Sequence, residues 1–126
     1  MIPYGRQHVD EDDIAAVTAA LRSSFLTGGP AVEAFERAVA ERVEARHAVA
    51  FSSGTAGLHA AAAVSGLGPG DVVATPSLSF AASANCARYV GAEVTFVDID
   101  EGTLNLDPEA VPPVDALVAV HFAGLP

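Results

Sequence analysis

The residues best suited to chemistry in this sequence are Ser52, Ser53, Gly54 and Thr55, which combine hydroxyl groups with a glycine. They follow an apolar run at 48–51 and precede an alanine-rich run at 58–64, a pattern that predicts a strand, a turn and a helix. Serine and threonine cap helices, and glycine lets the backbone approach a ligand closely. Because the amino end of a helix offers unpaired N–H groups and a positive dipole, this turn predicts a phosphate site; an ordinary capped turn without a ligand is the alternative.

The spacing in this turn differs from two common phosphate-binding motifs. A Walker loop would need Gly-Lys-Ser/Thr, and a dinucleotide-binding turn would need Gly-x-Gly-x-x-Gly; neither is present. No Ser-His-Asp arrangement is recognisable either. The acidic run at 10–13 is predicted to begin a helix, where the dipole favours carboxylates, rather than to bind a metal.

The composition narrows the class of protein. With 126 residues, 51% hydrophobic and 17% charged, the chain is predicted to fold around a core. A formal net charge of −10 makes nucleic acid and anionic membrane surfaces unfavourable partners. The single cysteine, Cys86, rules out an internal disulfide, and no apolar run is long enough to cross a bilayer. These features predict a soluble, cytoplasmic protein.

The apolar periodicity predicts which elements position the phosphate turn. Helices are expected to begin near residues 10 and 30, the second reaching about residue 46, with a further helix over 81–90 that Gly91 ends. Strands are expected at 48–51, 72–75, 94–97 and 116–120, with a short helical turn near residue 108. Apolar strands that alternate with helices predict an α/β fold with a parallel sheet covered on both faces. We divide the chain into an N-terminal arm with helices (1–46) and the first βα units of a larger domain (47–126).

Ligands of parallel α/β sheets bind at the carboxyl ends of the strands. The segment 77–80, Asp98 and His121 follow predicted strands and are therefore expected at that edge, together with Ser53. Asp98 and Asp100 are predicted to cap and turn the chain rather than to act as a carboxylate pair. For His121, a structural and an active-site role both stay open.

Two further expectations concern the rest of the chain. His59 lies on an alanine-rich helix and is predicted to belong to the core or to an interface. The sequence stops directly after a predicted strand, with no helix to cover it, which predicts part of a larger domain. A sheet without its remaining strands exposes an apolar edge, so we expect the chain alone to aggregate or to oligomerise.

Several short segments occur in a characteristic order. They are Ile2-Pro3-Tyr4, Phe25-Leu26-Thr27-Gly28-Gly29-Pro30, Phe35-Glu36, Ser53-Gly54-Thr55-Ala56-Gly57-Leu58-His59, Phe96-Val97-Asp98-Ile99-Asp100 and Val120-His121-Phe122-Ala123-Gly124. Together they resemble the N-terminal third of the DegT/DnrJ/EryC1/StrS sugar aminotransferases, over essentially the whole chain. The resemblance implies a fold-type-I enzyme that uses pyridoxal 5′-phosphate. Within the family, the chain resembles most the members that aminate a 4-keto-6-deoxy UDP-amino sugar, as in the pseudaminic acid pathway.

The resemblance also implies roles for individual residues. The cofactor phosphate would be held by Ser53, Gly54, Thr55 and Ala56. Phe80 would stack on the pyridine ring, for which a flat apolar face is suited; core packing is the alternative.

The amino-terminal arm is assigned to the substrate by the same resemblance. Tyr4 and Arg6 would approach the sugar nucleotide, and an arginine is suited to its diphosphate. The implied partners are a nucleotide-sugar substrate, an amino-acid donor, which we expect to be glutamate, and a second subunit in a homodimer with shared sites.

No catalytic residue is predicted within these residues. Amino transfer needs a lysine that bonds covalently to the cofactor, yet all six basic residues are arginine. In the family that lysine, and the acid that keeps the pyridine nitrogen protonated, follow the point where this sequence ends. The chain alone is therefore predicted to be inactive. The alternatives are a non-catalytic fragment that binds a phosphorylated ligand, a subunit of a split enzyme, or an unrelated α/β nucleotide-binding domain.

Overall fold

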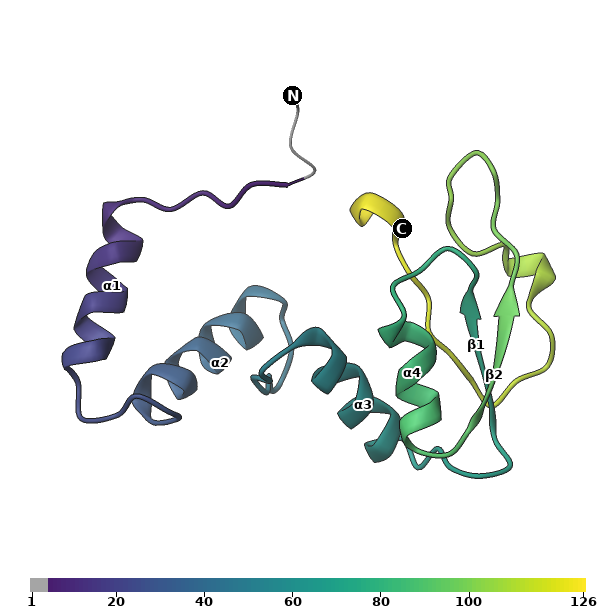
Figure 1. Ribbon diagram of the computed structural model, residues 1–126, viewed down its shortest axis with the longest axis horizontal. Helices are drawn as coiled ribbons and strands as arrows, with labels where there is room; N and C mark the ends of the chain where they lie inside the picture. The colour runs from purple at the N-terminus through teal and green to yellow at the C-terminus, as the bar shows by residue number, and fades with distance from the viewer. Residues whose placement is uncertain (1–4) are drawn as a thin grey trace. The chain divides into compact units, whose positions relative to one another are not determined.

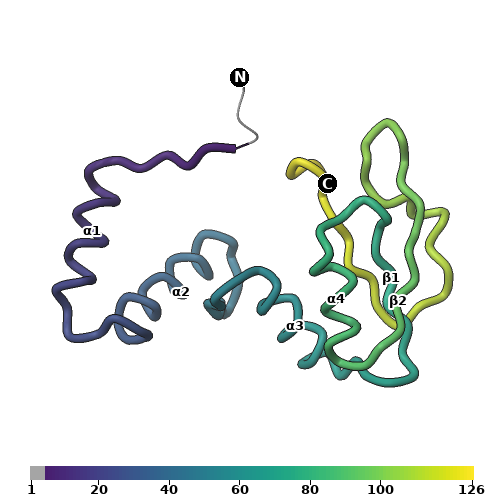
Figure 2. The backbone as a smooth tube through the Cα atoms, in the orientation of Figure 1, coloured from purple at the N-terminus to yellow at the C-terminus, as the bar shows by residue number. Residues whose placement is uncertain are grey.

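The protein is described by a computed structural model that covers residues 5–126. The chain forms two compact units, one that ends at Ala50 and one over Phe51–Pro126, and each is described by itself. Figure 1 shows the order of the elements along the chain, and Figure 2 traces the backbone that joins them. Tyr4, which the resemblance assigns to the substrate site, lies outside the described residues.

The first unit contains two helices, α1 (Glu11–Arg22) and α2 (Pro30–Arg42). The acidic run begins α1 as predicted, because Asp10 is its N-cap. One Asp10 carboxylate oxygen accepts hydrogen bonds from the amides of Asp12 and Asp13, each at 3.0 Å. In return, the Asp13 carboxylate accepts the Asp10 amide at 3.1 Å, which completes a capping box. These carboxylates therefore satisfy the first turn of a helix.

The second helix ends four residues earlier than the sequence predicted. It stops at Arg42 because Glu44 adopts a left-handed backbone (φ 54°) and the Ala45 amide bonds back to the Ala40 carbonyl at 2.9 Å. Its start is set by Pro30, at the first helical position, and by Gly29, whose φ is 76°. A Cβ at Gly29 would lie 2.9 Å from the Phe25 side chain, so both backbone and packing require glycine there.

The prediction of a strand at 48–51 is wrong. These residues form no strand, and Val49 is 68% exposed. Instead of joining a ladder, the Ala50 amide donates to the Glu36 carboxylate at 2.8 Å. A strand exists only where a second strand pairs with it, and within residues 5–126 this segment pairs with none. An apolar sequence alone therefore did not determine strand structure here.

The second unit is built on the parallel sheet that the sequence predicted. Its strands are β1 (Val72–Pro76), β2 (Glu93–Val97) and β3 (Ala116–Leu117), in the order β2-β1-β3. In the register of both parallel pairs, Val73 lies beside Val94 on one side and beside Ala116 on the other. β3 is shorter than the predicted 116–120, although a hydrogen bond from the Val118 amide to the Ala74 carbonyl (2.9 Å) extends the pairing slightly.

Two helices accompany this sheet, α3 (Gly54–Val64) and α4 (Ala82–Tyr89). They pack against each other, and α4 also packs on β1 and β2 (Figure 1). The core contains Val73, Ala87 and Ala92, which are at most 2% exposed. Short 3-10 turns follow at η1 (Pro108–Ala110), as predicted near residue 108, and at η2 (Phe122–Gly124).

Gly91 ends α4 as predicted. Its φ is 87°, a left-handed value that favours glycine, and the next amide, that of Ala92, bonds back to the Ala87 carbonyl at 3.0 Å. This cap turns the chain directly into β2. Because β1 and β2 are parallel, the two segments that leave them emerge at the same edge of the sheet.

Candidate phosphate and cofactor site

The amino end of α3 is built as the sequence predicted. Ser53 has an extended backbone and caps the helix, and its Oγ accepts the Ala56 amide at 3.2 Å. The Gly57 amide bonds to the Ser53 carbonyl at 3.1 Å, so the first complete turn is closed. The amides of Gly54 and Thr55, at the first two helical positions, have no partner within the helix. They remain as donors at the positive end of an eleven-residue helix.

This end of the helix fits a phosphate group. Gly54 is exposed, and a Cβ built there would meet no atom within 4 Å, so a ligand can approach the backbone closely. Because Ser53 Oγ already serves as an acceptor, its own hydroxyl hydrogen remains available for a phosphate oxygen. The Ala56 amide is already engaged by that oxygen, which leaves Gly54 and Thr55 as the stronger backbone donors.

Phe80 lies in the loop that joins β1 to α4, and its side chain is 78% exposed. It borders a hollow of about 360 Å³ at the carboxyl end of β1 and β2. The hollow is lined by Thr75, Pro76, Ser77, Ser79, Phe80, Ala81, Ala84, Asn85 and Phe96. An exposed aromatic ring beside a hollow with hydroxyl groups is suited to stack on a planar ligand ring. Because the Phe80 ring is so exposed, it contributes little to a hydrophobic core.

The Phe80 loop is fixed from the first turn of α4. The Ser79 hydroxyl donates to Ser83 Oγ at 2.6 Å, and the Ser83 amide donates to the Phe80 carbonyl at 3.0 Å. Ser83 is only 6% exposed, so this anchor is protected from water. The sequence did not single out Ser83. The only available signal was the spacing of four residues between Ser79 and Ser83 at the start of a predicted helix.

The loop that follows β2 is organised by Asp100. One of its carboxylate oxygens accepts the Gly102 amide (3.0 Å), the Thr103 amide (2.7 Å) and the Thr103 hydroxyl (3.0 Å). The bonds from the Thr103 amide and hydroxyl, and then that from Gly102, lower the pKa of Asp100 from its ordinary value of 3.8. Asp98 accepts the neighbouring Ile99 amide at 3.0 Å. The prediction that these two acids cap and turn the chain is therefore confirmed.

His121 lies four residues after the end of β3 and immediately precedes η2. The turn 122–125 is joined to the loop after β2 by Asn105, whose side-chain oxygen accepts the Phe122 amide at 2.7 Å and whose side-chain nitrogen donates to the Leu125 carbonyl at 3.0 Å. Sequence reasoning did not predict this connection. No local pattern reveals a side chain that bonds to residues 17 and 20 positions away.

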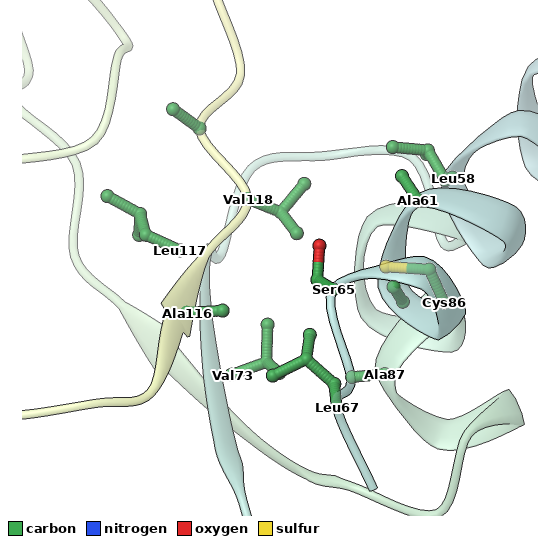
Figure 3. A pocket seen from close by; sticks show the side chains of 12 residues that line it. Leu58, Ala61, Ser65, Leu67, Val73, Cys86, Ala87, Ala116, Leu117 and Val118 are labelled. Carbon is green, nitrogen blue, oxygen red and sulfur yellow. The ribbon is translucent and has the colours of Figure 1, made fainter.

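A second cavity, of about 320 Å³, lies between α3, α4 and the strands β1 and β3. Figure 3 shows that its wall consists almost entirely of aliphatic side chains, among them Leu58, Val73 and Val118. Ser65 supplies a hydroxyl group and Cys86, 2% exposed, a buried thiol. This cavity lacks charged lining residues that could bind a phosphate. The amino end of α3, with its two open amides, and the hollow beside Phe80, whose lining includes the hydroxyls of Ser77 and Ser79, are the better candidates for a cofactor.

The other residues considered from the sequence lie elsewhere. Arg6 is exposed in the first unit, before α1. His59 is exposed on α3 and packs against Tyr89 of α4 in a tilted arrangement, with 5.1 Å between the ring centroids and 58° between the ring planes. Within residues 5–126, no three side chains of metal-ligating type form a cluster. Across the same residues, none of the helices combines the length and the apolar character required to cross a membrane.

A three-stranded parallel sheet whose strands alternate with helices, together with a capped, glycine-containing helix start, is typical of a phosphate-binding α/β domain. The chain belongs to the DegT/DnrJ/EryC1/StrS aminotransferase family, which matches residues 7–126. The fold is that of the first part of the large domain of fold-type-I enzymes that use pyridoxal 5′-phosphate, as predicted.

Named relatives support the same assignment. The chain is 43% identical to the spore coat polysaccharide biosynthesis protein SpsC of Bacillus subtilis (strain 168), over 98% of this chain and 33% of the relative. It is 38% identical to the UDP-4-amino-4-deoxy-L-arabinose–oxoglutarate aminotransferase of Shewanella sediminis (strain HAW-EB3), again over 98% and 33%. The chain thus spans about a third of the length of these curated relatives.

Among solved structures, Spr1654 of Streptococcus pneumoniae, a protein assigned as a sugar aminotransferase, superposes in its apo-form with a TM-score of 0.90 and 30% identity. The match covers 98% of this chain and 32% of Spr1654. Spr1654 has also been solved in a pyridoxal 5′-phosphate form and in a pyridoxamine phosphate form. Pyridoxal 5′-phosphate is therefore the cofactor of this family, as predicted.

Proposed function

We propose that this chain supplies the phosphate and ring contacts of a sugar aminotransferase that uses pyridoxal 5′-phosphate. The observation that carries the proposal is the amino end of α3. There, two amides without helical partners and an open glycine backbone lie beside the capping Ser53. Gly54 and Thr55 donate to the phosphate from the backbone, and the hydroxyls of Ser53 and Thr55 add two further donors. The Phe80 ring packs against the flat face of the cofactor.

When bound, the cofactor provides the electron sink that lets an amino group leave one carbon and join another. The residues described here hold and orient it; they cannot bond to it covalently, because the chain contains no lysine. Residues 1–126 by themselves therefore bind cofactor without completing amino transfer.

In the assembled enzyme, the amino group moves from glutamate to a 4-keto-6-deoxy nucleotide sugar, with the pseudaminic acid type as the specific candidate. The support is the resemblance of the opening segment and of residues 53–59, together with relatives whose names include polysaccharide biosynthesis and a UDP-amino sugar. Arg6, and Tyr4 outside the described residues, bind the substrate diphosphate. The protein works in the cytoplasm as a homodimer, and its partners are the two small-molecule substrates.

The first test is a ligand titration of the complete gene product. Pyridoxal 5′-phosphate is compared with pyridoxal, which lacks the phosphate, and with AMP, which has a phosphate on a nucleoside. We expect the phosphorylated cofactor to bind at least tenfold more tightly than pyridoxal, because charge-assisted hydrogen bonds to phosphate each contribute about 1.5–3 kcal/mol. AMP should bind more weakly than the cofactor. Tighter binding of AMP would favour an unrelated nucleotide-binding domain and would contradict the proposal.

A further inference from the structure

Two loops leave the same edge of the sheet and are joined by one side chain. The loop after β2 contains Asn105, and the turn after β3 contains Phe122 and Leu125. Asn105 accepts the Phe122 amide at 2.7 Å and donates to the Leu125 carbonyl at 3.0 Å. Because β1 lies between β2 and β3 in the sheet, this bridge connects the exits of the two outer strands. We call this pair of hydrogen bonds the Asn105 bridge.

The main chain of Asn105 is held firmly enough to position another segment. Its carbonyl accepts the Asp100 amide at 2.9 Å, and its amide donates to the Thr103 hydroxyl at 3.3 Å. The same loop is closed by a hydrogen bond from the Leu104 amide to the Asp100 carbonyl at 2.8 Å. Asp107, two residues further on, bonds through its amide to the Asp98 carbonyl at 3.0 Å, next to the end of β2. The loop therefore presents the Asn105 side chain from a fixed base.

The turn on the other side of the bridge is strained. Ala123 has a φ of 54°, which costs free energy for a residue with a Cβ, and Gly124 follows with 81°. Such a conformation persists only where neighbouring contacts determine it. The only hydrogen bonds that reach the turn from outside, within residues 5–126, are the two of the Asn105 bridge, which flank Ala123 on both sides.

We propose that Asn105 is a positioning residue of the cofactor and substrate site, because its bridge holds the turn 121–125, and with it His121, at the carboxyl edge of the sheet. The step rests on the proposed function, which places the ligand at that edge. Asn105 acts through the turn and touches no ligand itself. Its amide is suited to the task because it offers one acceptor and one donor at once, which neither a carboxylate nor a hydrocarbon side chain does.

The test compares three variants of the complete gene product. Asn105→Ala removes both bonds of the bridge, and Asn105→Asp keeps the acceptor for Phe122 but loses the donor to Leu125. Asp107→Ala is the matched control: it removes a side-chain hydrogen bond of the same loop, that to the Glu109 amide, and leaves the bonds of Asn105 and of the turn in place. The first readout is amide hydrogen exchange at Phe122, which requires no cofactor. The second compares the cofactor Kd with kcat and KM for amino transfer to the nucleotide sugar.

We expect the Phe122 amide to exchange roughly five- to tenfold faster in Asn105→Ala than in Asp107→Ala, which corresponds to the loss of a typical hydrogen bond. Asn105→Asp should lie between the wild type and Asn105→Ala. In the second readout, kcat/KM should fall about tenfold in Asn105→Ala while the cofactor Kd changes less than twofold. A purely structural role would instead change Kd and kcat/KM together with the melting temperature.

Equal exchange at Phe122 in Asn105→Ala and Asp107→Ala would overturn the inference, and so would equal values of kcat/KM in these two variants. If the wild-type protein binds no pyridoxal 5′-phosphate, the proposed function fails and Asn105 cannot be a positioning residue of that site. The exchange result then still decides separately whether the Asn105 bridge holds the turn.

Discussion

Replacing Thr55 by alanine separates phosphate binding from folding. Thr55 occupies the second position of α3, and within the described part of the chain its hydroxyl makes no hydrogen bond. Alanine is a slightly better helix former, by about 0.5 kcal/mol, so Thr55→Ala should leave the free energy of unfolding unchanged or raise it a little. The same hydroxyl is proposed to donate to the cofactor phosphate. Losing a hydrogen bond to a charged group costs about 1.5–3 kcal/mol, so the cofactor Kd should rise by a factor of roughly 10–150.

The assay is a fluorescence titration of the complete gene product with pyridoxal 5′-phosphate, paired with urea denaturation. Thr55→Ser keeps the hydroxyl and should bind within about threefold of the wild type, a difference of well under 1 kcal/mol. Gly57→Ala is a second control on the same helix, because its new Cβ would lie 3.6 Å from the Phe51 ring, an ordinary contact away from the first two amides. Equal affinities of Thr55→Ala and the wild type would refute the assignment of this hydroxyl to the phosphate.

Three further predictions concern neighbouring residues. Phe80→Ala should raise the cofactor Kd about two- to tenfold, with little loss of stability because the ring is 78% exposed. Phe80→Tyr keeps an aromatic ring and should bind the cofactor as the wild type does in the same titration. Ser53→Ala removes the cap on the Ala56 amide and should lower the free energy of unfolding by about 1 kcal/mol in urea; an unchanged value would show that the cap contributes nothing. Asp100 has a lowered pKa in the folded protein, so its stabilising effect is complete above its unfolded value of 3.8 and is lost as the pH falls through the folded pKa. The difference in melting temperature between the wild type and Asp100→Ala should therefore be constant from about pH 5 to 8 and shrink below about pH 4; a difference that grows in acid would contradict the assigned hydrogen bonds.

The sequence predicted those elements whose signals are local. Asp10 and Asp13 form a complete capping box at the start of α1. Gly91 ends α4 because glycine readily adopts a left-handed backbone. Ser53 caps α3 through a hydrogen bond to the amide three residues further along the chain. The parallel sheet followed from the alternation of apolar runs with helices. The capped start of α3 was predictable for the same reason, since its serine, glycine and threonine are adjacent.

Features that depend on distant partners were not predictable in this way. The run 48–51 has the composition of a strand, but a strand requires a neighbour, and the Ala50 amide bonds to Glu36 instead. The second helix was predicted too long because its end depends on a left-handed backbone at Glu44, and glutamate, unlike glycine, does not indicate such a conformation in a sequence. The Asn105 bridge could not be predicted from the sequence because its two hydrogen bonds join residues that are 17 and 20 positions apart.

The most direct test of the central claim is a crystal structure of the complete gene product grown with pyridoxal 5′-phosphate. We expect the phosphate oxygens to lie within hydrogen-bonding distance of the amides of Gly54 and Thr55 and of the hydroxyls of Ser53 and Thr55. The pyridine ring should stack on Phe80. A cofactor phosphate bound elsewhere, with these donors in contact with water, would contradict the assignment of the α3 amino end as the phosphate site.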